Sequence, residues 1–399
     1  MPQDKLTSEE AAELLGISKA TLYSYVSRGV IRSLPAEAGT RRRYYKRSEV
    51  VALKHRHSYR NDPERAAREV IEFGNPILTT SISQITATDH SYRGMSSHEL
   101  AETSTFEQVA QFLWTGERAG SKLVEARPEW KTTTDANVPN WLPQELTPLE
   151  RMQCLLPALE HEDLSSYSAK PAVLIPSAIR ILKYLTLLSG GLASKGIAAS
   201  LADAWEADAS TLDSLLIMVA DHELNIATFT ARCAASAGSN LYQAVLAGLT
   251  ALQGHKHLHG QVAAARDFFD EVIEAGDPEP VLRRYLRIGG NVPGFHNPYR
   301  RLYVDRDPRV GVILELLSVG KNAELLHKTV ELAESATGEH TRIDFALGCV
   351  EATLGLPRDA TFSLIAIGRT AGMIAHILEQ YTSERVIRPR AQYIGSASL

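Results

Sequence analysis

The sequence predicts a mainly α-helical protein that carries a small basic module at its N-terminus. From Pro76 onward, apolar residues recur three and four positions apart, the spacing of a buried helix face, and alternating β-branched residues are scarce. The chain has 399 residues, of which 44% are hydrophobic and 22% charged, enough to bury a sizeable core in two or three domains. Its net charge of −5 is unevenly distributed, because residues 1–56 hold 11 Lys/Arg against 6 Asp/Glu. That excess of cations marks residues 1–56 as a separate module.

The basic module has the spacing of a helix-turn-helix. Ser8 can cap a first helix, Ser18 can cap a second, and a glycine ends each of them. A basic and aromatic run, Arg41-Arg-Arg-Tyr-Tyr-Lys-Arg47, follows and leads into a further short helix. The stretch Leu6–Leu53 resembles the winged helix-turn-helix of MerR-type and excisionase-type proteins, in which the second helix enters a groove and the wing grips phosphate.

This resemblance implies that residues 1–56 contact double-stranded DNA. The candidates for groove contacts are Thr21, Tyr23 and Ser24, and those for backbone contacts are Arg41, Arg42, Arg43 and Lys46. A triple arginine beside two tyrosines exceeds what a solvated face requires, which favours DNA. The alternative is a small helical domain that docks another protein and has lost the ability to bind nucleic acid.

A charged linker is expected at residues 57–75, with a helical stretch after Pro63. Beyond it, helical periodicity is clearest in five segments, and only Ile77–Ile85 has the pattern of a short hairpin. The five segments are Ser104–Trp114, Ser177–Leu188, Leu212–Met218, Leu241–Leu252 and Thr361–Gln380. Heptads are not sustained long enough for a coiled coil.

Composition also indicates which partners to expect. Cys154, Cys233 and Cys349 are widely spaced within apolar helical patterns, so neither a disulfide framework nor a zinc site is expected. The histidine-rich run at 255–259 lacks neighbouring cysteine or carboxylate ligands, so we expect no metal there. No apolar run approaches membrane-spanning length and the N-terminus lacks a secretory pattern, which together predict a cytoplasmic protein with no membrane partner.

Six local clusters in the helical region occur in the order and approximate spacing seen in citrate synthases. Four of them are Ala220-Asp-His-Glu-Leu-Asn225, Leu258-His-Gly260, Asp307-Pro-Arg309 and Ile343-Asp-Phe345. The flanking two are Ser91-Tyr-Arg-Gly94 with Thr105-Phe-Glu-Gln-Val109, and Arg388-Pro-Arg-Ala391 with Tyr393 and Gly395. Their joint occurrence is far more specific than any single cluster. The chain from about residue 76 to residue 399 therefore resembles the citrate synthase family.

The resemblance implies a fold, an assembly and a reaction. The fold is a large helical domain, residues 76–260 and 345–399, that closes together with a small helical domain, residues 261–344, over the substrates. The assembly is a homodimer. The reaction condenses an acyl-CoA, usually acetyl-CoA, with oxaloacetate to give citrate or a homologue and free CoA. No cofactor is implied, because the coenzyme A thioester is itself a substrate.

Asp344 is the carboxylate whose surroundings suit the removal of a proton from carbon. It lies in the apolar run Ile343-Asp-Phe-Ala-Leu-Gly348, where lost solvation makes a carboxylate a stronger base than it is in water. A thioester methyl is a weak carbon acid, so this base needs a partner that donates to the developing enolate oxygen. The resemblance implies that Asp344 is the base.

The enolate donor is assigned to His259. Leu258-His-Gly260 matches the family's Pro-Leu-His-Gly-Gly run, and the glycine after His259 lets backbone approach a ligand closely. An ungapped overlay of Gly254-His-Lys-His257 on the family's Gly-Pro-Leu-His gives the role to His257 instead. Gln261 stands where the family has a second glycine, a change that would narrow the coenzyme A pocket.

For the keto acid, the resemblance implies that His222 binds the ligand and that Arg309 and Arg369 clamp its carboxylates. Arginine suits this task because its planar fork binds a carboxylate with two parallel hydrogen bonds. Arg388 would reach in from a neighbouring subunit, which makes the dimer obligatory.

The carbonyl-polarising position departs from the family's pattern. The family has Gly-Phe-Gly-His before Asp-Pro-Arg, whereas this chain reads Gly294-Phe-His-Asn-Pro-Tyr299. If the backbone shifts by one residue, His296 can donate to the keto carbonyl. Otherwise Asn297 offers a neutral amide, at a cost of roughly 2–4 kcal/mol in barrier, as for the loss of one oxyanion donor.

Two functional hypotheses follow. The first is a citrate synthase-type enzyme with an added DNA-binding or docking module, which the intact Asp344, His222, Arg309 and Arg369 favour. The second is a transcription regulator whose synthase-like body senses an acyl-CoA or a keto acid without efficient turnover. The irregular stretches at 258–261 and 295–297 and the N-terminal module favour this alternative.

Overall fold

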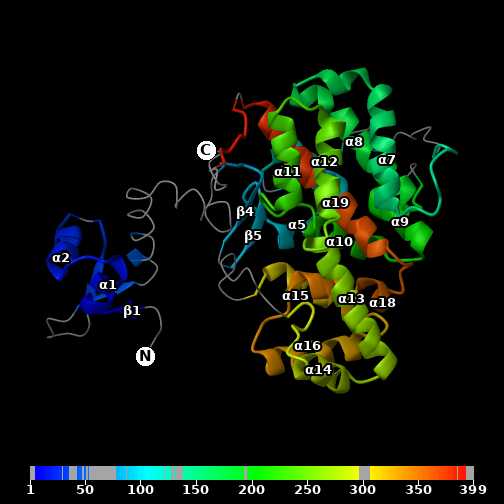
Figure 1. The fold of residues 1–399 in the computed structure, drawn as a ribbon. Coiled ribbons are helices and arrows are strands. Elements are labelled where there is room, and N and C mark those ends of the chain that lie inside the picture. The colour runs from blue at the N-terminus through cyan, green and yellow to red at the C-terminus, as the bar shows by residue number, and fades with distance from the viewer. Residues whose placement is uncertain are drawn as a thin grey trace, which may run out of the picture. The chain divides into compact units, whose positions relative to one another are not determined.

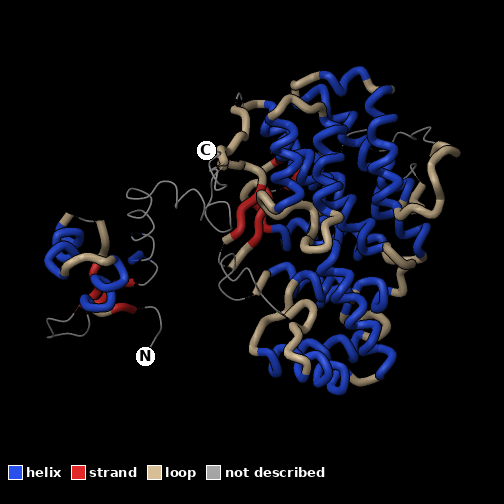
Figure 2. The backbone as a smooth tube through the Cα atoms, viewed as in Figure 1, coloured by secondary structure: helices blue, strands red, loops and turns tan. Residues whose placement is uncertain are grey.

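The computed structural model of the chain describes a defined set of residues in two compact units, Met1–Thr79 and Thr80–Leu399 (Figures 1 and 2). The described residues are 5–28, 30–35, 43–46, 49–50, 53, 78–86, 88–120, 122–126, 130, 138–192, 196–295, 306–383 and 385–391. The predicted linker at 57–75 lies outside them.

Among its described residues, the N-terminal unit shows two complete helices, further helical residues at 49–50 and 53, and a small antiparallel sheet. The helices are α1 (Ser8–Leu15) and α2 (Lys19–Ser27), and the strands β1 (Lys5–Leu6), β2 (Ser33–Pro35) and β3 (Arg43–Lys46) pair in the order β1-β3-β2. Both predicted helices are confirmed. The cap of α1 is Thr7 rather than Ser8, because Thr7 forms a capping box with Glu10, whereas Ser18 caps α2 as predicted.

A separate apolar core holds this unit together. Leu22 of α2 and Tyr45 of β3 are fully buried in it, and Ala11 of α1 packs beside them. Gly16 ends α1 with φ 66°, a left-handed conformation that glycine adopts without strain. The sheet and the two helices therefore form a winged helix-turn-helix with its own interior.

The second unit is built almost entirely of helices (Figure 1). Its first helices are α5 (Ser97–Thr103), α6 (Phe106–Thr115), α7 (Pro148–His161), α8 (Pro171–Leu188), α9 (Ile197–Trp205), α10 (Ala209–Met218), α11 (Ile226–Ser236) and α12 (Leu241–Leu252), with a 3-10 turn at Leu164–Tyr167. They continue with α13 (Leu258–Ala275), α14 (Pro278–Arg287), α15 (Pro308–Leu317), α16 (Ala323–Thr337), α17 (Ile343–Gly348), α18 (Val350–Leu354) and α19 (Ala360–Tyr381). All five helical segments expected from periodicity are confirmed.

Two short sheets complete the unit. The strands β4 (Ser83–Ile85), β5 (His90–Tyr92) and β6 (Met95–Ser96) pair antiparallel in that order, and β7 (Arg118–Ala119) pairs with β8 (Lys122–Leu123). The predicted hairpin at Ile77–Ile85 is therefore only partly right. Its C-terminal residues form β4, and the partner strand lies further along the chain.

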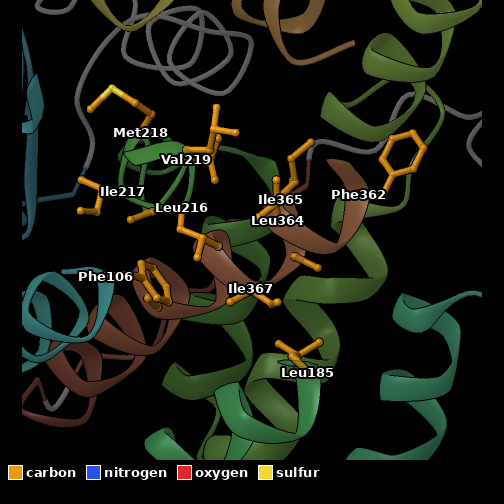
Figure 3. Close-up of a cluster of buried hydrophobic side chains, with 14 of the residues drawn as sticks. Phe106, Leu185, Leu216, Ile217, Met218, Val219, Phe362, Leu364, Ile365 and Ile367 are labelled. Atoms are coloured by element: carbon orange, nitrogen blue, oxygen red, sulfur yellow. The ribbon is translucent and has the colours of Figure 1, made fainter. Parts of the chain in front are cut away.

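α19 is the central helix of this unit. Side chains of α19 pack against α6, α8, α10, α11 and α12, and Figure 3 shows Leu364, Ile365 and Ile367 beside Leu216–Val219 and Phe106. α10 approaches so closely that a Cβ on Gly368 would lie 2.6 Å from Val219 Cγ2. Glycine at this point therefore allows α19 to touch the end of α10.

α8 and α19 are long and apolar enough, by length and composition, to cross a membrane. The expectation that no apolar segment approaches this length is therefore wrong. However, 67% of the relevant residues of α8 and 100% of those of α19 are buried inside the protein. Such burial is what the core helices of a folded domain show.

The helices α13, α14 and α16 pack on one another, and α17 packs on α13 and α15. In Figure 1 these helices lie at the end of the unit away from α7, α8 and α12. The boundaries predicted for the large domain (76–260 and 345–399) and the small domain (261–344) stay a prediction. The candidate side chains of this unit described below lie on β5, α13, α15, α17, α19, the loop after α10 and the residues just before α13 and α17.

Candidate functional site

The loop between α10 and α11 carries His222. α10 ends at Met218, and Asn225 caps α11 by accepting from Ala227 N at 3.1 Å and Thr228 N at 3.3 Å. The intervening loop is tight, because Glu223 has φ 49°, an uncommon value for a residue with a side chain. His222 therefore occupies a fixed position between two helix ends.

Strand β4 holds this loop by side-chain hydrogen bonds. Ser83 Oγ donates to Asp221 Oδ2 and accepts from Glu223 N at 3.1 Å. Ile85 N donates to Glu223 Oε1 at 2.9 Å. The residues on both sides of His222 are thus attached to one strand.

A buried pair on the other side of the loop joins it to α19. His376 Nε2 lies 3.2 Å from Asp221 Oδ2, and both side chains are fully buried. Burial favours a higher pKa for Asp221, but the His376 imidazole and the Ser83 hydroxyl outweigh it, so the pKa lies below its usual value. The sequence assigned no role to Asp221 or His376, although Asp221 directly precedes His222.

His222 lies in a cationic environment. Burial lowers the pKa of its imidazole well below the usual value, and the charges of Arg309 and Arg369 lower it further, as do His90 and His257. Its ring stacks on His90 with a centroid distance of 5.9 Å and an angle of 24°. We call His90, His222, His257, Arg309 and Arg369 the His–Arg cluster. His222 is a neutral imidazole within it.

Arg309 enters the cluster from the first turn of α15. Its Nε and Nη2 donate to the two carboxylate oxygens of Asp307 at 3.0 and 2.6 Å, and its Nη1 lies 3.5 Å from Met218 O. Burial favours a higher pKa for Asp307, but Arg309 outweighs it and the pKa is lowered. The guanidinium is only 1% exposed. Asp307 therefore orients Arg309 and compensates its charge.

Arg369 comes from the middle of α19 and is 4% exposed. Its charge lowers the pKa values of His90, His222 and His257. Its guanidinium is therefore within electrostatic range of three imidazoles from different elements. Two arginines and three histidines that are far apart in sequence therefore converge.

Asp344 lies in the first turn of α17 and is 3% exposed. Arg342 Nη2 is 2.7 Å from Asp344 Oδ2, and the same nitrogen donates to Gln261 Oε1 at 3.2 Å. Burial raises the pKa of Asp344, Arg342 opposes the rise, and the charges of Asp307 and Arg309 act on it more weakly. Asp344 is thus a buried carboxylate within electrostatic range of Arg309. Arg342 was missed in the sequence, although it lies two residues before Asp344.

The two donor candidates His257 and His259 face different neighbours. His257 precedes α13, and burial followed by the charge of Arg369 lowers its pKa to about 4. Its Nε2 is buried and has no hydrogen-bond partner among the described residues. His259 instead stacks on Phe362 with a centroid distance of 4.1 Å, beside Arg266. His257, the alternative in the sequence, is the histidine that belongs to the cluster.

Gly260 lies against the backbone of the loop that precedes α13. A Cβ on Gly260 would overlap the carbonyl oxygen of His255. Gly260 therefore allows the 255–257 backbone to approach α13 closely, and the choice of His259 as the enolate donor stays a prediction.

Three candidates are placed less completely. His296 and Asn297 lie outside the described residues, although the preceding Phe295 packs on Phe345 with a centroid distance of 4.7 Å. Arg388 is exposed in the segment 385–391, which is tied to α11 through Ile387 N and Ser236 Oγ at 3.1 Å.

In the N-terminal unit, the groove candidates lie on α2. Tyr23 is 51% exposed, Ser24 is exposed, and Thr21 N donates to Ser18 Oγ at 3.2 Å. On β3, Arg43 and Lys46 are exposed, and Arg43 Nη1 donates to Ser33 Oγ at 2.8 Å. Arg41 and Arg42 lie outside the described residues.

Residues 73–390 match the family model of the citrate synthase C-terminal domain. The chain belongs to the citrate synthase family. Residues 6–58 match a helix-turn-helix domain model, which agrees with the winged helix-turn-helix resemblance. Both resemblances found in the sequence, and the fold class they implied, are thereby confirmed.

Two curated relatives illustrate this membership. Citrate synthase 2 of Bacillus subtilis is 26% identical over 79% of this chain and 93% of its own length. 2-Methylcitrate synthase 2 of Corynebacterium glutamicum is 27% identical over 79% of this chain and 92% of its own. Relatives thus include synthases named for two different products.

Solved structures show the same fold. A complex of citrate synthase from Thermoplasma acidophilum with carboxymethyl coenzyme A and oxaloacetate has a TM-score of 0.68 at 23% identity, covering 81% of this chain and 95% of that one. Citrate synthase from Thermotoga maritima has a TM-score of 0.65, also at 23% identity, covering 82% and 95%. This family member therefore combines a synthase fold with an N-terminal helix-turn-helix.

Proposed function

We propose that the chain condenses a short acyl-CoA, acetyl-CoA first among them, with oxaloacetate to give citrate or a homologue and free CoA. The observation that supports this best is the convergence of one buried carboxylate, Asp344, with the His–Arg cluster. Such a group contains a base for carbon, neutral imidazole donors and guanidinium forks for carboxylates. Family membership supports the same class of reaction.

The keto acid would bind first among the cations. Arg309 and Arg369 would take its two carboxylates, and His222 would contact the ligand from the loop after α10. Asp307 already compensates the charge of Arg309, so a bound carboxylate would mainly offset the buried charge of Arg369, while Arg309 would contribute hydrogen bonds. Arg388 of a second subunit would complete the clamp, so the proposal includes a homodimer.

Proton removal would follow at the acyl-CoA. Asp344 would take a proton from the carbon next to the thioester carbonyl, and His257 Nε2–H would donate to the enolate oxygen that forms. The new carbanion equivalent would attack the keto carbon, and water would then cleave the thioester and release CoA. The proton would go to Asp344 Oδ1, since Arg342 Nη2 lies 2.7 Å from Oδ2.

Release of free thiol tests this proposal. Full-length protein given oxaloacetate and acetyl-CoA or propionyl-CoA is expected to release thiol, and Asp344→Asn to abolish it. The matched control is Asp267→Asn, since the Asp267 side chain is 67% exposed on α13. Comparing the two thioesters determines the acyl chain preference. If the Asp344→Asn variant releases thiol as fast as the wild type, Asp344 is not the base.

The second candidate function is transcription regulation by ligand sensing. It is favoured by the helix-turn-helix domain that precedes the synthase fold in the same chain. Calorimetry with oxaloacetate and acetyl-CoA separates the two proposals. Binding without thiol release from any short acyl-CoA would establish a sensor, whereas turnover would establish the enzyme.

For the N-terminal unit we propose binding to double-stranded DNA. The exposed Tyr23 and Ser24 on α2 and the exposed Arg43 and Lys46 on β3 support this, because α2 presents polar groups while the strand presents cations. Affinity of the full-length protein for duplex DNA is expected to fall steeply as salt rises. Lys46→Ala should reduce the slope of the logarithm of the binding constant against the logarithm of the salt concentration by about one. It should also weaken binding to all DNA sequences alike. Absent or salt-insensitive binding would reassign the unit to protein docking.

A further inference from the structure

His90 is a buried histidine in the His–Arg cluster that neither the sequence motifs nor the proposed mechanism uses. It is fully buried on β5, stacks on His222 at 5.9 Å and lies edge-on to Tyr92 at 5.0 Å. The charges of Arg309, Asp307, Asp221 and Arg369 all act on it. His90 therefore lies where the keto acid would bind.

The hairpin β4–β5 fixes this position. In the antiparallel ladder, His90 pairs with Ile85, and Ile85 N also binds Glu223 Oε1 at 2.9 Å. Strand β4 thus pairs with the strand that carries His90 and also binds the loop that carries His222. Backbone pairing and these hydrogen bonds therefore bring the segments that carry the two stacked imidazoles together.

The start of the hairpin is attached to α19. Ser81 N and Oγ donate to Glu379 Oε1 at 2.7 and 2.8 Å, and Arg232 Nη1 donates to Glu379 Oε2 at 2.9 Å. Since α19 also carries Arg369, the hairpin and that guanidinium share one rigid support. The hairpin that carries His90 is thereby fastened to the helix that carries Arg369.

His90 is uncharged and has one ring N–H. Burial, followed by the charge of Arg309, lowers its pKa to about 3. Its Nδ1 lies 3.1 Å from Ser97 Oγ, and either atom can be the donor of this hydrogen bond. We take the tautomer in which Ser97 donates and the ring proton lies on Nε2. Nε2 is buried and has no hydrogen-bond partner among the described residues. Buried donors without partners are rare in folded proteins, so this one indicates a missing acceptor.

We propose that His90 is a further catalytic residue, whose Nε2–H donates to the keto oxygen of oxaloacetate. This rests on the proposed function. The two arginines match the charges of the carboxylates, whereas a neutral N–H matches the uncharged carbonyl and strengthens its hydrogen bond as an alkoxide develops. The carbonyl donor that the sequence sought at 296–297 is then supplied by β5.

Two matched variants test the role of Nε2. His90→Asn keeps an amide at the position of Nδ1, within reach of Ser97, but places no group at Nε2. His90→Gln extends an amide N–H to the position of Nε2. Both are polar and smaller than histidine, so they differ mainly in where the donor lies. His327→Asn, exposed on α16, is the surface control.

The readouts are the affinity for oxaloacetate by calorimetry, the keto C=O stretching frequency of bound, ¹³C-labelled oxaloacetate, and kcat for thiol release. In the wild type the frequency is expected to fall relative to that of free oxaloacetate. In His90→Asn it should return toward the free value and kcat should drop by about 10²–10³-fold. His90→Gln should keep part of both, while affinity in either variant changes less than tenfold.

An unchanged frequency and kcat in His90→Asn would overturn the role of His90 and leave the proposed function standing. Failure of the wild type to bind oxaloacetate would overturn both. Binding with a lowered frequency but no thiol release would overturn the condensation and keep His90 as the carbonyl donor of a sensor. Thermal melts of both variants identify any loss of fold, and His90→Gln still tests the donor if His90→Asn does not fold.

Discussion

Replacement of Arg342 by glutamine tests how the buried base is held. Arg342 Nη2 lies 2.7 Å from Asp344 Oδ2, and the two side chains are 18% and 4% exposed. Removing one partner of a buried ion pair costs about 3–5 kcal/mol when the other charge remains. At about 2 °C per kcal/mol for a large domain, we expect Tm to fall by about 6–10 °C at neutral pH.

The fall in Tm caused by Arg342→Gln should become larger as pH rises. Burial already raises the pKa of Asp344, and removal of the Arg342 guanidinium takes away what opposes that rise. A carboxyl whose pKa is raised on folding favours the folded state at low pH, where it is protonated in both states, and loses that contribution as pH rises through its folded pKa. The Tm difference between wild type and Arg342→Gln should therefore be small near pH 4 and grow toward pH 8.

Differential scanning calorimetry across this range measures the effect without requiring turnover. The control is Arg283→Gln, since Arg283 is 75% exposed in an (i, i+4) pair on α14 and exposed pairs contribute little. If the protein releases thiol, the acid limb of its kcat/KM profile should also move to higher pH in Arg342→Gln. A Tm loss that is the same at every pH would refute the reasoning, because it would mean that Arg342 acts through packing alone.

Three further predictions follow from particular contacts. Gly372→Ala should destabilise the protein by about 1–3 kcal/mol, because the added Cβ would lie 2.5 Å from Asp221 Oδ1. Gly311→Ala should stabilise it by about 0.5–1 kcal/mol, because the added Cβ would meet open space in a helix. Thermal melts measure both. Thr7→Ala should lower the free energy of unfolding of the N-terminal unit by about 1 kcal/mol, because Thr7 caps α1, and Ser8→Ala should lower it much less. Chemical denaturation measures both. Because the pKa of Asp221 is lowered on folding, Asp221→Asn should flatten the loss of Tm that the wild type shows as pH falls from 5 to 3.

Helices were the part of the fold most accessible from the sequence. Leu241–Leu252 coincides with α12 because its apolar spacing and its flanking Asn240 cap are both local features. α8 begins at Pro171, six residues before the predicted start at Ser177, and it contains Pro176. Proline normally breaks a helix interior. The buried face of α8 outweighs that preference, a tertiary effect that no local pattern reports.

The candidate site divides in the same way. His222 and Arg309 could be named as candidates from the sequence because each lies in a recognisable cluster, Ala220–Asn225 or Asp307–Arg309. His90 and His376 were not found, because their importance arises from pairing with residues more than a hundred positions away. The choice of His259 over His257 stays a prediction, because Gly260 lies against the backbone of His255 and a glycine there is compatible with ligand approach and with backbone approach.

This division has a physical cause that bears on how the site works. A motif records groups that must face a ligand, and their spacing follows the helix or turn that carries them. Support for those groups comes from buried polar contacts such as Asp221–His376 and Ser83–Asp221, which join segments separated by 138 or more residues. Any of several residue pairs can satisfy one buried hydrogen bond, so such contacts leave no fixed spacing. A departure at a motif position is therefore weak evidence for lost activity when, as with His90, another segment presents a donor to the same cluster.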